Sequence, residues 1–138
     1  MTVKSNTRQF KAKLKAAVVR GVANGVEIVL DEASSMVMDG QKSGRIYRRR
    51  GAEHQASAPG EAPASDTGRL VQSGHTEVLT EGQIVRGRVT WSTAYALKLE
   101  VGTEKVAPRP FVRPALAATK GAVERALIVE LLPIFGSK

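Results

Sequence analysis

The densest group of charged side chains in the sequence is of a kind that binds anions. Five basic residues and one aromatic residue lie between positions 42 and 50, namely Lys42, Arg45, Tyr47, Arg48, Arg49 and Arg50. Such a group can contact phosphates and stack on a base, with an affinity that falls as salt rises. Arginine also makes bidentate pairs with carboxylates, which suits a contact with another protein subunit. A third possibility, a solvated loop without a partner, stays open at this stage.

The residues that usually carry catalysis or bind metals are few and widely separated. The chain has no cysteine, and its two histidines, His54 and His75, lack the spacing of a zinc site. Ser57, His54 and Asp66 can be written as a catalytic triad, but a flexible loop provides neither orientation nor an oxyanion hole. Phosphate-binding glycine motifs are absent, and no pair of carboxylates has acid–base spacing. We therefore expect no catalytic site, no metal and no cofactor.

Composition predicts a single domain over residues 1–138. Hydrophobic residues make up 42% of the chain and aromatic residues only 4%, so the core must be built from valine, leucine, alanine and isoleucine. The net charge of +8 favours nucleic acid or an acidic protein surface as a partner. No stretch has the length of a membrane span or the apolar run of a signal peptide, and the absence of cysteine fits a reducing cytoplasm.

A long amphipathic helix is predicted over residues 6–38. Its apolar positions advance by three or four: Phe10, Leu14, Val18, Val22, Val26, Val29, Ala33 and Met36. Asn6 or Thr7 can cap the start of the helix, and a turn at residues 39–40 can end it. Gly21 and Gly25 lie inside it, either as local weak points that packing overrides or as places where another helix comes close.

The rest of the chain predicts a small antiparallel sheet and a second helix, so that the fold class is α+β. Residues 39–70 show no periodicity and are expected to form a long loop. Residues 71–94 predict a β-hairpin with a turn at Gly82 and with Trp91 on its apolar face. A connector at 95–112 contains one helical turn, and a final helix at 113–133 starts near Pro114 and ends at Pro133.

Two stretches of the chain resemble the neck and tail-completion proteins of long-tailed phages related to lambda. They are "SAPGEAPASDTGRLVQS" (57–73) and, after the hairpin, "YALKLEVGT" followed by "APRPFVRPAL". The positions that carry the likeness are Ser57, Pro59, Gly60, Pro63, Thr67, Gly68, Leu70, Ser73, Tyr95, Ala96, Glu100, Gly102, Thr103, Arg109, Pro110, Phe111, Arg113, Pro114, Ala115 and Leu116. Val101 and Val112 depart from the pattern, in which an aromatic residue and a leucine are frequent.

The resemblance implies a non-enzymatic structural protein of the virion, assembled in the host cytoplasm and located in the phage neck or tail. It implies a homo-oligomeric ring that joins the DNA-filled head to the tail. By analogy with the tail tubes of such phages, this ring would be a hexamer. Its partners would be a head-side stopper or connector ring, the tail terminator and tube proteins, and genomic DNA that crosses the lumen without sequence specificity. The alternative function is that of a small basic nucleic-acid-binding protein.

The proline-rich segment 107–114 is predicted to form the contact between subunits, because fixed backbone angles reduce the entropy lost on docking. The predicted interface residues are Tyr95, Glu100, Arg109, Pro110, Phe111, Arg113 and Pro114. Phe111 is either an apolar anchor in a neighbouring subunit or a part of the subunit's own core. The basic residues 42–50 would face the DNA lumen or an acidic neighbouring ring.

Overall fold

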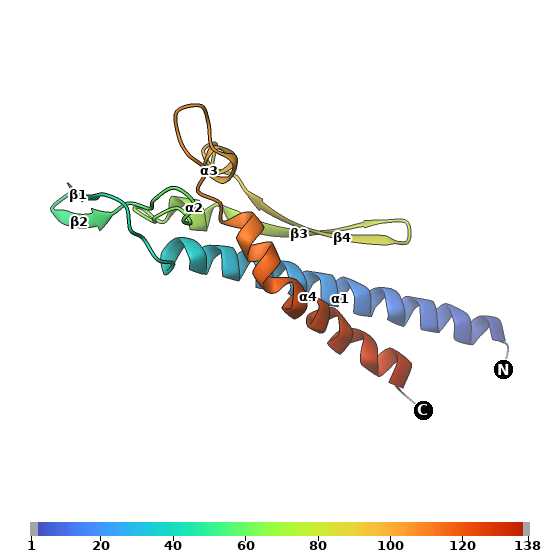
Figure 1. Ribbon diagram of the computed structural model, residues 1–138. Coiled ribbons are helices and arrows are strands. Elements are labelled where there is room, and N and C mark those ends of the chain that lie inside the picture. Colours follow the sequence, from blue (N-terminus) through green and yellow to red (C-terminus); the bar gives the residue numbers. More distant parts are fainter. Residues whose placement is uncertain (1–2, 137–138) are drawn as a thin grey trace.

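The computed structural model describes residues 3–136, and its architecture is α+β, as the sequence predicts. The elements are α1 (Val3–Met38), β1 (Ile46–Arg49), β2 (Ala52–Gln55), α2 (Arg69–Gln72), β3 (Gly74–Glu81), β4 (Ile84–Trp91), α3 (Ala96–Val101) and α4 (Val112–Gly136). The long helices α1 and α4 lie side by side, the hairpin β3–β4 runs along α1, and the hairpin β1–β2 extends from one end (Figure 1). The molecule is therefore elongated, and α1 begins at the end where α4 stops.

Small residues let α1 and α4 approach closely. Six buried positions of α1 recur at every fourth residue: Ala17, Gly21, Gly25, Val29, Ala33 and Val37. A Cβ atom on Gly21 would lie 2.6 Å from Cδ1 and 3.0 Å from Cα of Leu127, and one on Gly25 would lie 3.0 Å from Cγ1 of Val123. Of the two explanations that the sequence leaves open for these glycines, close approach of another helix is therefore confirmed.

Gly21→Ala is expected to destabilise the protein, although alanine favours a helix more than glycine does. The new methyl group would meet the backbone of α4, and overpacking of this kind costs about 1–3 kcal/mol. Gly121→Ala is the matched control, because its nearest neighbour would be the flexible end of Arg125 at 3.3 Å, and it should gain up to about 1 kcal/mol. Urea unfolding of both variants checks the opposite signs, and equal effects would contradict the close helix contact.

The hairpin β3–β4 has the predicted position and turn. Its two-residue turn places Gly82 at a φ of 61°, and its antiparallel register pairs Gly74 with Trp91 and Val78 with Gly87. A Cβ atom on Gly87 would lie 2.3 Å from Cγ1 of Val26, so the sheet rests directly on α1. Trp91 is half-buried and meets the ring of Phe111 edge-on, with centroids 5.1 Å apart. The prediction that Trp91 lies on the inner face is confirmed.

The prediction that residues 39–70 form one long ordered loop is wrong in part. This segment contains β1, β2 and the start of the one-turn helix α2. The turn of the first hairpin places Arg50 and Gly51 at φ values of 53° and 82°, the conformation of a type I′ turn. Periodicity misses this hairpin because its strands have four residues each and are largely exposed, so no apolar alternation marks them.

Two helix boundaries also differ from the prediction. The first helix begins at Val3, so Asn6 and Thr7 lie inside it and do not cap it. Its end at Met38 agrees with the sequence. The last helix continues through Pro133 to Gly136, although we predict its end at the proline. A proline near the last turn costs a helix few hydrogen bonds, and Phe135 in that turn contacts the ring of Phe10 on α1, with centroids 5.8 Å apart.

The main core lies where four helices meet. Its buried members are Ala33, Val37, Leu70, Ala96, Phe111 and Ala115, which come from α1, α2, α3, the residue before α4 and the first turn of α4. The helical turn α3 is confirmed, and it ends at Gly102, whose φ is 77°. Within residues 3–136, no helix combines the length and the apolar character needed to cross a bilayer.

Candidate functional site

A hollow of about 820 Å³ brings the two predicted groups of residues together. Arg49 and Arg50 line it from the first hairpin, and Tyr95 and Arg109 line it from the connector. Arg69 of α2 adds a further arginine. These segments are up to about sixty residues apart in the sequence, and the fold brings them to the same hollow. The arginines therefore converge on one space instead of forming a linear stripe.

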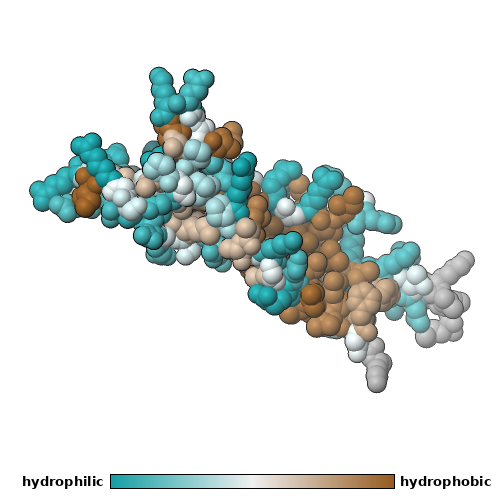
Figure 2. Space-filling model, in the orientation of Figure 1, coloured by the Kyte–Doolittle hydropathy of each residue, from teal (hydrophilic) through white to brown (hydrophobic). Residues whose placement is uncertain are grey.

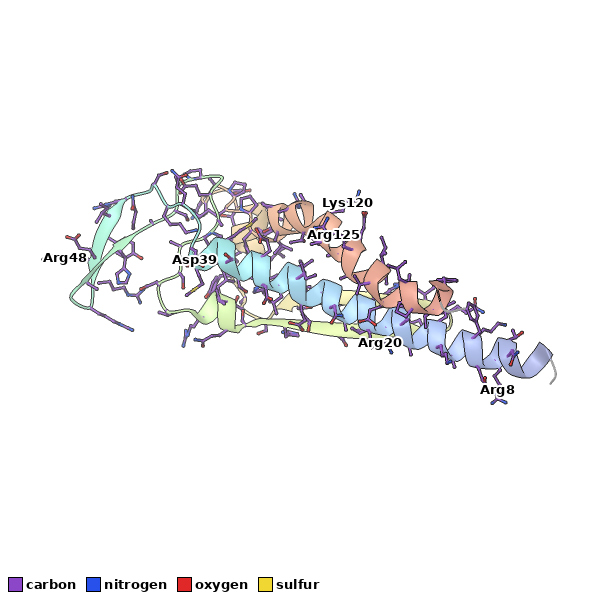
Figure 3. All side chains as sticks on the ribbon, turned by 90° about the horizontal axis from the view of Figure 1, so that it is seen from below. Arg8, Arg20, Asp39, Arg48, Lys120 and Arg125 are labelled. Carbon is purple, nitrogen blue, oxygen red and sulfur yellow. The ribbon has the colours of Figure 1, made fainter. Side chains whose placement is uncertain are left out.

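The first hairpin sorts its side chains between two faces. Tyr47 and Arg49 alternate with Arg48 along β1, and the hollow is lined by Tyr47 and Arg49 but not by Arg48. Arg48 forms a 3.6 Å ion pair with Glu53, its partner in the register. Figure 3 shows Arg48 at the outer edge of this hairpin, at the opposite end of the molecule from Arg8. Only part of the basic group thus faces the hollow.

The hollow already holds one carboxylate, which belongs to Asp66. Arg49 donates a hydrogen bond to Asp66, and Nδ1 of His54 lies 3.8 Å from the other carboxylate oxygen. The ring of His54 in turn stacks on Tyr47, with centroids 5.7 Å apart. The charged side chains of the lining are four arginines and this one aspartate, which gives a net charge of +3. The site is therefore strongly electropositive even after its internal ion pair.

Two of the four guanidinium groups have no partner within the part of the chain that the structure describes. Arg50 and Arg69 make no side-chain hydrogen bond or ion pair there. Arg109 donates from Nε and Nη2 to the carbonyl oxygen of Ser57, at 3.3 Å each. The hollow thus presents unused planar donors from two different elements.

Lys42 has a different role from the arginines that follow it. Its Nζ donates to the carbonyl oxygens of Met36 and Ala62, both at 2.9 Å, and so ties the end of α1 to the following segment. Burial lowers the pKa of Lys42, and the charge of Glu61 opposes that shift. Glu61 itself has a lowered pKa, mainly because the Ser43 hydroxyl donates to it. Arg45 is exposed and lies outside the lining of the hollow.

Glu100 holds the start of α4. Its carboxylate accepts hydrogen bonds from the backbone N–H groups of Phe111 (2.8 Å), Val112 (3.0 Å) and Arg113 (2.9 Å). The first N–H groups of a helix lack partners within the helix, and an anion near them also favours the helix dipole. The sequence offers no spacing rule for this contact, because the acceptor lies in another helix.

The remaining residues predicted at a subunit interface take several positions in the single chain. Phe111 is 1% exposed and belongs to the chain's own core, which is the second of the two alternatives for it. Pro110 and Pro114 are half-buried, whereas Arg113 is exposed and Tyr95 is 41% exposed. The side chains of this set that remain accessible are therefore those of Tyr95 and Arg113, with Arg109 reaching the hollow.

The three residues considered as a triad do not assemble into one. The distance between His54 and Asp66 is beyond hydrogen-bond range, and no hydrogen bond joins Ser57 to His54 in the described chain. Ser57 is 5% exposed, and its carbonyl oxygen holds Arg109. Among the described residues, no group of three or more histidine, aspartate or glutamate side chains is placed to bind a metal ion.

Comparisons with protein-family models, with curated proteins and with solved structures found no match. The role of the hollow is therefore inferred from its own residues. Four guanidinium groups, two tyrosines and a solvent-open shape can hold a compact anion, by bidentate hydrogen bonds and by charge.

Arg69 is the lining residue that the sequence does not indicate. It lies in a helix of four residues, too short to show a periodic pattern. Its neighbour Leu70 is 7% exposed and belongs to the core. Burial of Leu70 fixes the position of the Arg69 backbone beside it. Only the fold shows that the Arg69 side chain lines the same hollow as Arg49 and Arg50 of the first hairpin.

Proposed function

We propose that this chain is a structural subunit of a ring in the neck or tail-completion region of a long-tailed phage. The similarity of residues 57–73 and 95–116 to that family supports the role, and it is the source of the proposed hexamer, virion location and neighbouring rings. In the ring, identical copies surround a lumen that genomic DNA crosses, and no copy performs catalysis. DNA would be contacted through its phosphates, because every sequence must pass.

The observation that carries the proposal is a large apolar face left open on α4. Its most prominent side chains are Ile128 (51% exposed), Val129 (65%), Leu132 (61%) and Phe135 (65%). Figure 2 shows a continuous hydrophobic surface over the second half of α4. Monomeric proteins seldom leave such contiguous patches exposed, and patches of this kind mark contacts between proteins. A second copy of the chain in a ring would cover this face.

The sheets and the charge distribution agree with a subunit that needs neighbours. Each described sheet has only two strands, so every strand keeps one edge without a backbone partner. Isolated two-stranded sheets are marginal, and open edges favour pairing with another chain. The alternative of a small nucleic-acid-binding protein has weaker support, because Arg8 of α1 and Arg48 of the first hairpin lie at opposite ends of the molecule (Figure 3).

Deletion of this gene from its phage is expected to give filled heads and complete tails that do not join, as seen by electron microscopy of the lysate. The wild-type chain supplied in trans should restore virions, whereas Val129→Asp should not, because a buried charge in the α4 contact costs several kcal/mol. Val129→Ile is the matched control and should restore them. Infectious, joined virions from the deletion would reject the role.

A further inference from the structure

We propose that the arginine-lined hollow is a docking site for an acidic peptide segment of a neighbouring protein. The occupant would place one or two carboxylates between Arg50, Arg69 and Arg109. This inference rests on the proposed function, in which the chain lies between other rings, and it names the chemistry by which one of them is recognised. The face of α4 is not needed for it, whereas the connector supplies Arg109 and Tyr95.

The arrangement of the arginines favours a compact anion over duplex DNA. A duplex carries one charge in about every 1.7 Å of its axis, so phosphate binding needs basic side chains spread along a line. Here the guanidinium groups approach one space from three elements: the turn of the first hairpin, α2 and the connector. Arg48, which would extend a line along the hairpin, turns to the other face and pairs with Glu53.

The volume and the existing contacts of the hollow fit a peptide carboxylate. Sites of about 300–1,000 Å³ hold groups of the size of a few side chains, and this one measures about 820 Å³. Asp66 shows that the site accepts a carboxylate, because it is held by Arg49 with His54 nearby. The planar donors of Arg50 and Arg69 have no partner in the described chain and match the two oxygens of a second carboxylate.

The tyrosines give little support to base stacking. One face of Tyr47 is already covered by His54. Tyr95 lines the hollow from another segment, and among the described residues no ring contact joins it to Tyr47. Successive aromatic faces along a groove are typical of single-strand binding. The same two hydroxyl groups can instead donate hydrogen bonds to a peptide.

The test is a titration of the full chain with a fluorescein-labelled hexaglutamate peptide, followed by anisotropy. Binding by the wild type is expected, and the double variant Arg50→Asn, Arg69→Gln should weaken it at least about tenfold, because hydrogen bonds to charged groups are lost. Asparagine tolerates the positive φ of position 50. The matched control, Arg48→Gln with Arg125→Gln, removes the same charge outside the hollow and should leave binding within about twofold.

Several results would overturn the site. They are no binding by the wild type, an equal loss in the control variant, displacement of the peptide by an equal concentration of inorganic phosphate, and tighter binding of a short DNA duplex than of the peptide. Circular dichroism is used to check that both double variants are folded, and Arg69→Gln alone provides a second test that leaves the hairpin turn unchanged. Peptide binding by the wild-type chain, together with joined virions from the gene deletion, would reject the neck role alone. No peptide binding, together with a deletion that leaves heads and tails unjoined, would reject the site alone.

Discussion

Phe111→Ala is expected to lower the free energy of unfolding by about 3–5 kcal/mol, the usual cost of removing a fully buried aromatic side chain. Phe111 is 1% exposed, is among the largest fully buried side chains, and meets Trp91 edge-on at 5.1 Å. Domains of this size are stable by only about 5–15 kcal/mol, so the variant should lose a large part of the total. Urea unfolding followed by tryptophan fluorescence measures the change.

Phe135→Ala is the matched control for that experiment. The same atoms are removed, but Phe135 is 65% exposed, and its loss should cost less than about 1 kcal/mol. Both variants are compared at one protein concentration, because assembly would add its own stabilisation. Equal losses in the two variants would show that Phe111 does not anchor the core.

Glu100→Ala is expected to destabilise the protein by about 2 kcal/mol, at the upper end of the cost of losing a helix cap. The carboxylate accepts three backbone N–H groups at the start of α4, and water can replace it only in part because two of these contacts are partly buried. Glu100→Gln, which keeps one amide oxygen, should lose less. The loss is read from the unfolding midpoint and from the amide chemical shifts of residues 111–113.

Glu104→Ala is the control for this second prediction. Glu104 is exposed in the loop that follows α3, and among the described residues the cap of α4 is formed by Glu100. Replacement of Glu104 should change stability by less than about 0.5 kcal/mol. If both alanine variants lose the same amount, the cap is not what holds α4 in place.

The sequence predicts those parts of the fold whose residues repeat with a regular period. Alternation along residues 84–91 indicates the second hairpin, and the three-to-four spacing over residues 10–36 indicates the first helix. The first hairpin has no such period because its strands are short and polar, and its turn depends on two positive φ angles at Arg50 and Gly51. The last helix continues past the expected stop at Pro133 because a proline near the last turn removes few hydrogen bonds.

The candidate site is predictable in parts and not as a whole. The basic group and the connector both stand out in the sequence, but nothing in their spacing shows that Arg50 and Arg109 share one hollow. Local patterns also do not separate Lys42, which ties down the end of α1, from the arginines beside it. The contacts of Phe111 and Glu100 also cannot be predicted from local patterns. Phe111 contacts Trp91 and Glu100 caps the start of α4, and both contacts depend on the tertiary fold.

The uneven distribution of the core along the molecule has a mechanical consequence. Near Ala33 and Val37, α1 packs against buried residues of the other three helices and the connector. Its first turns contact the C-terminal end of α4, for example through the rings of Phe10 and Phe135. Among residues 6–16 of α1 no side chain is buried, so less apolar packing holds the two helices together at this end than near Ala33 and Val37. A small change in the separation of the helices at this end would let the subunit adjust to neighbours of slightly different curvature without disturbing the arginine-lined end.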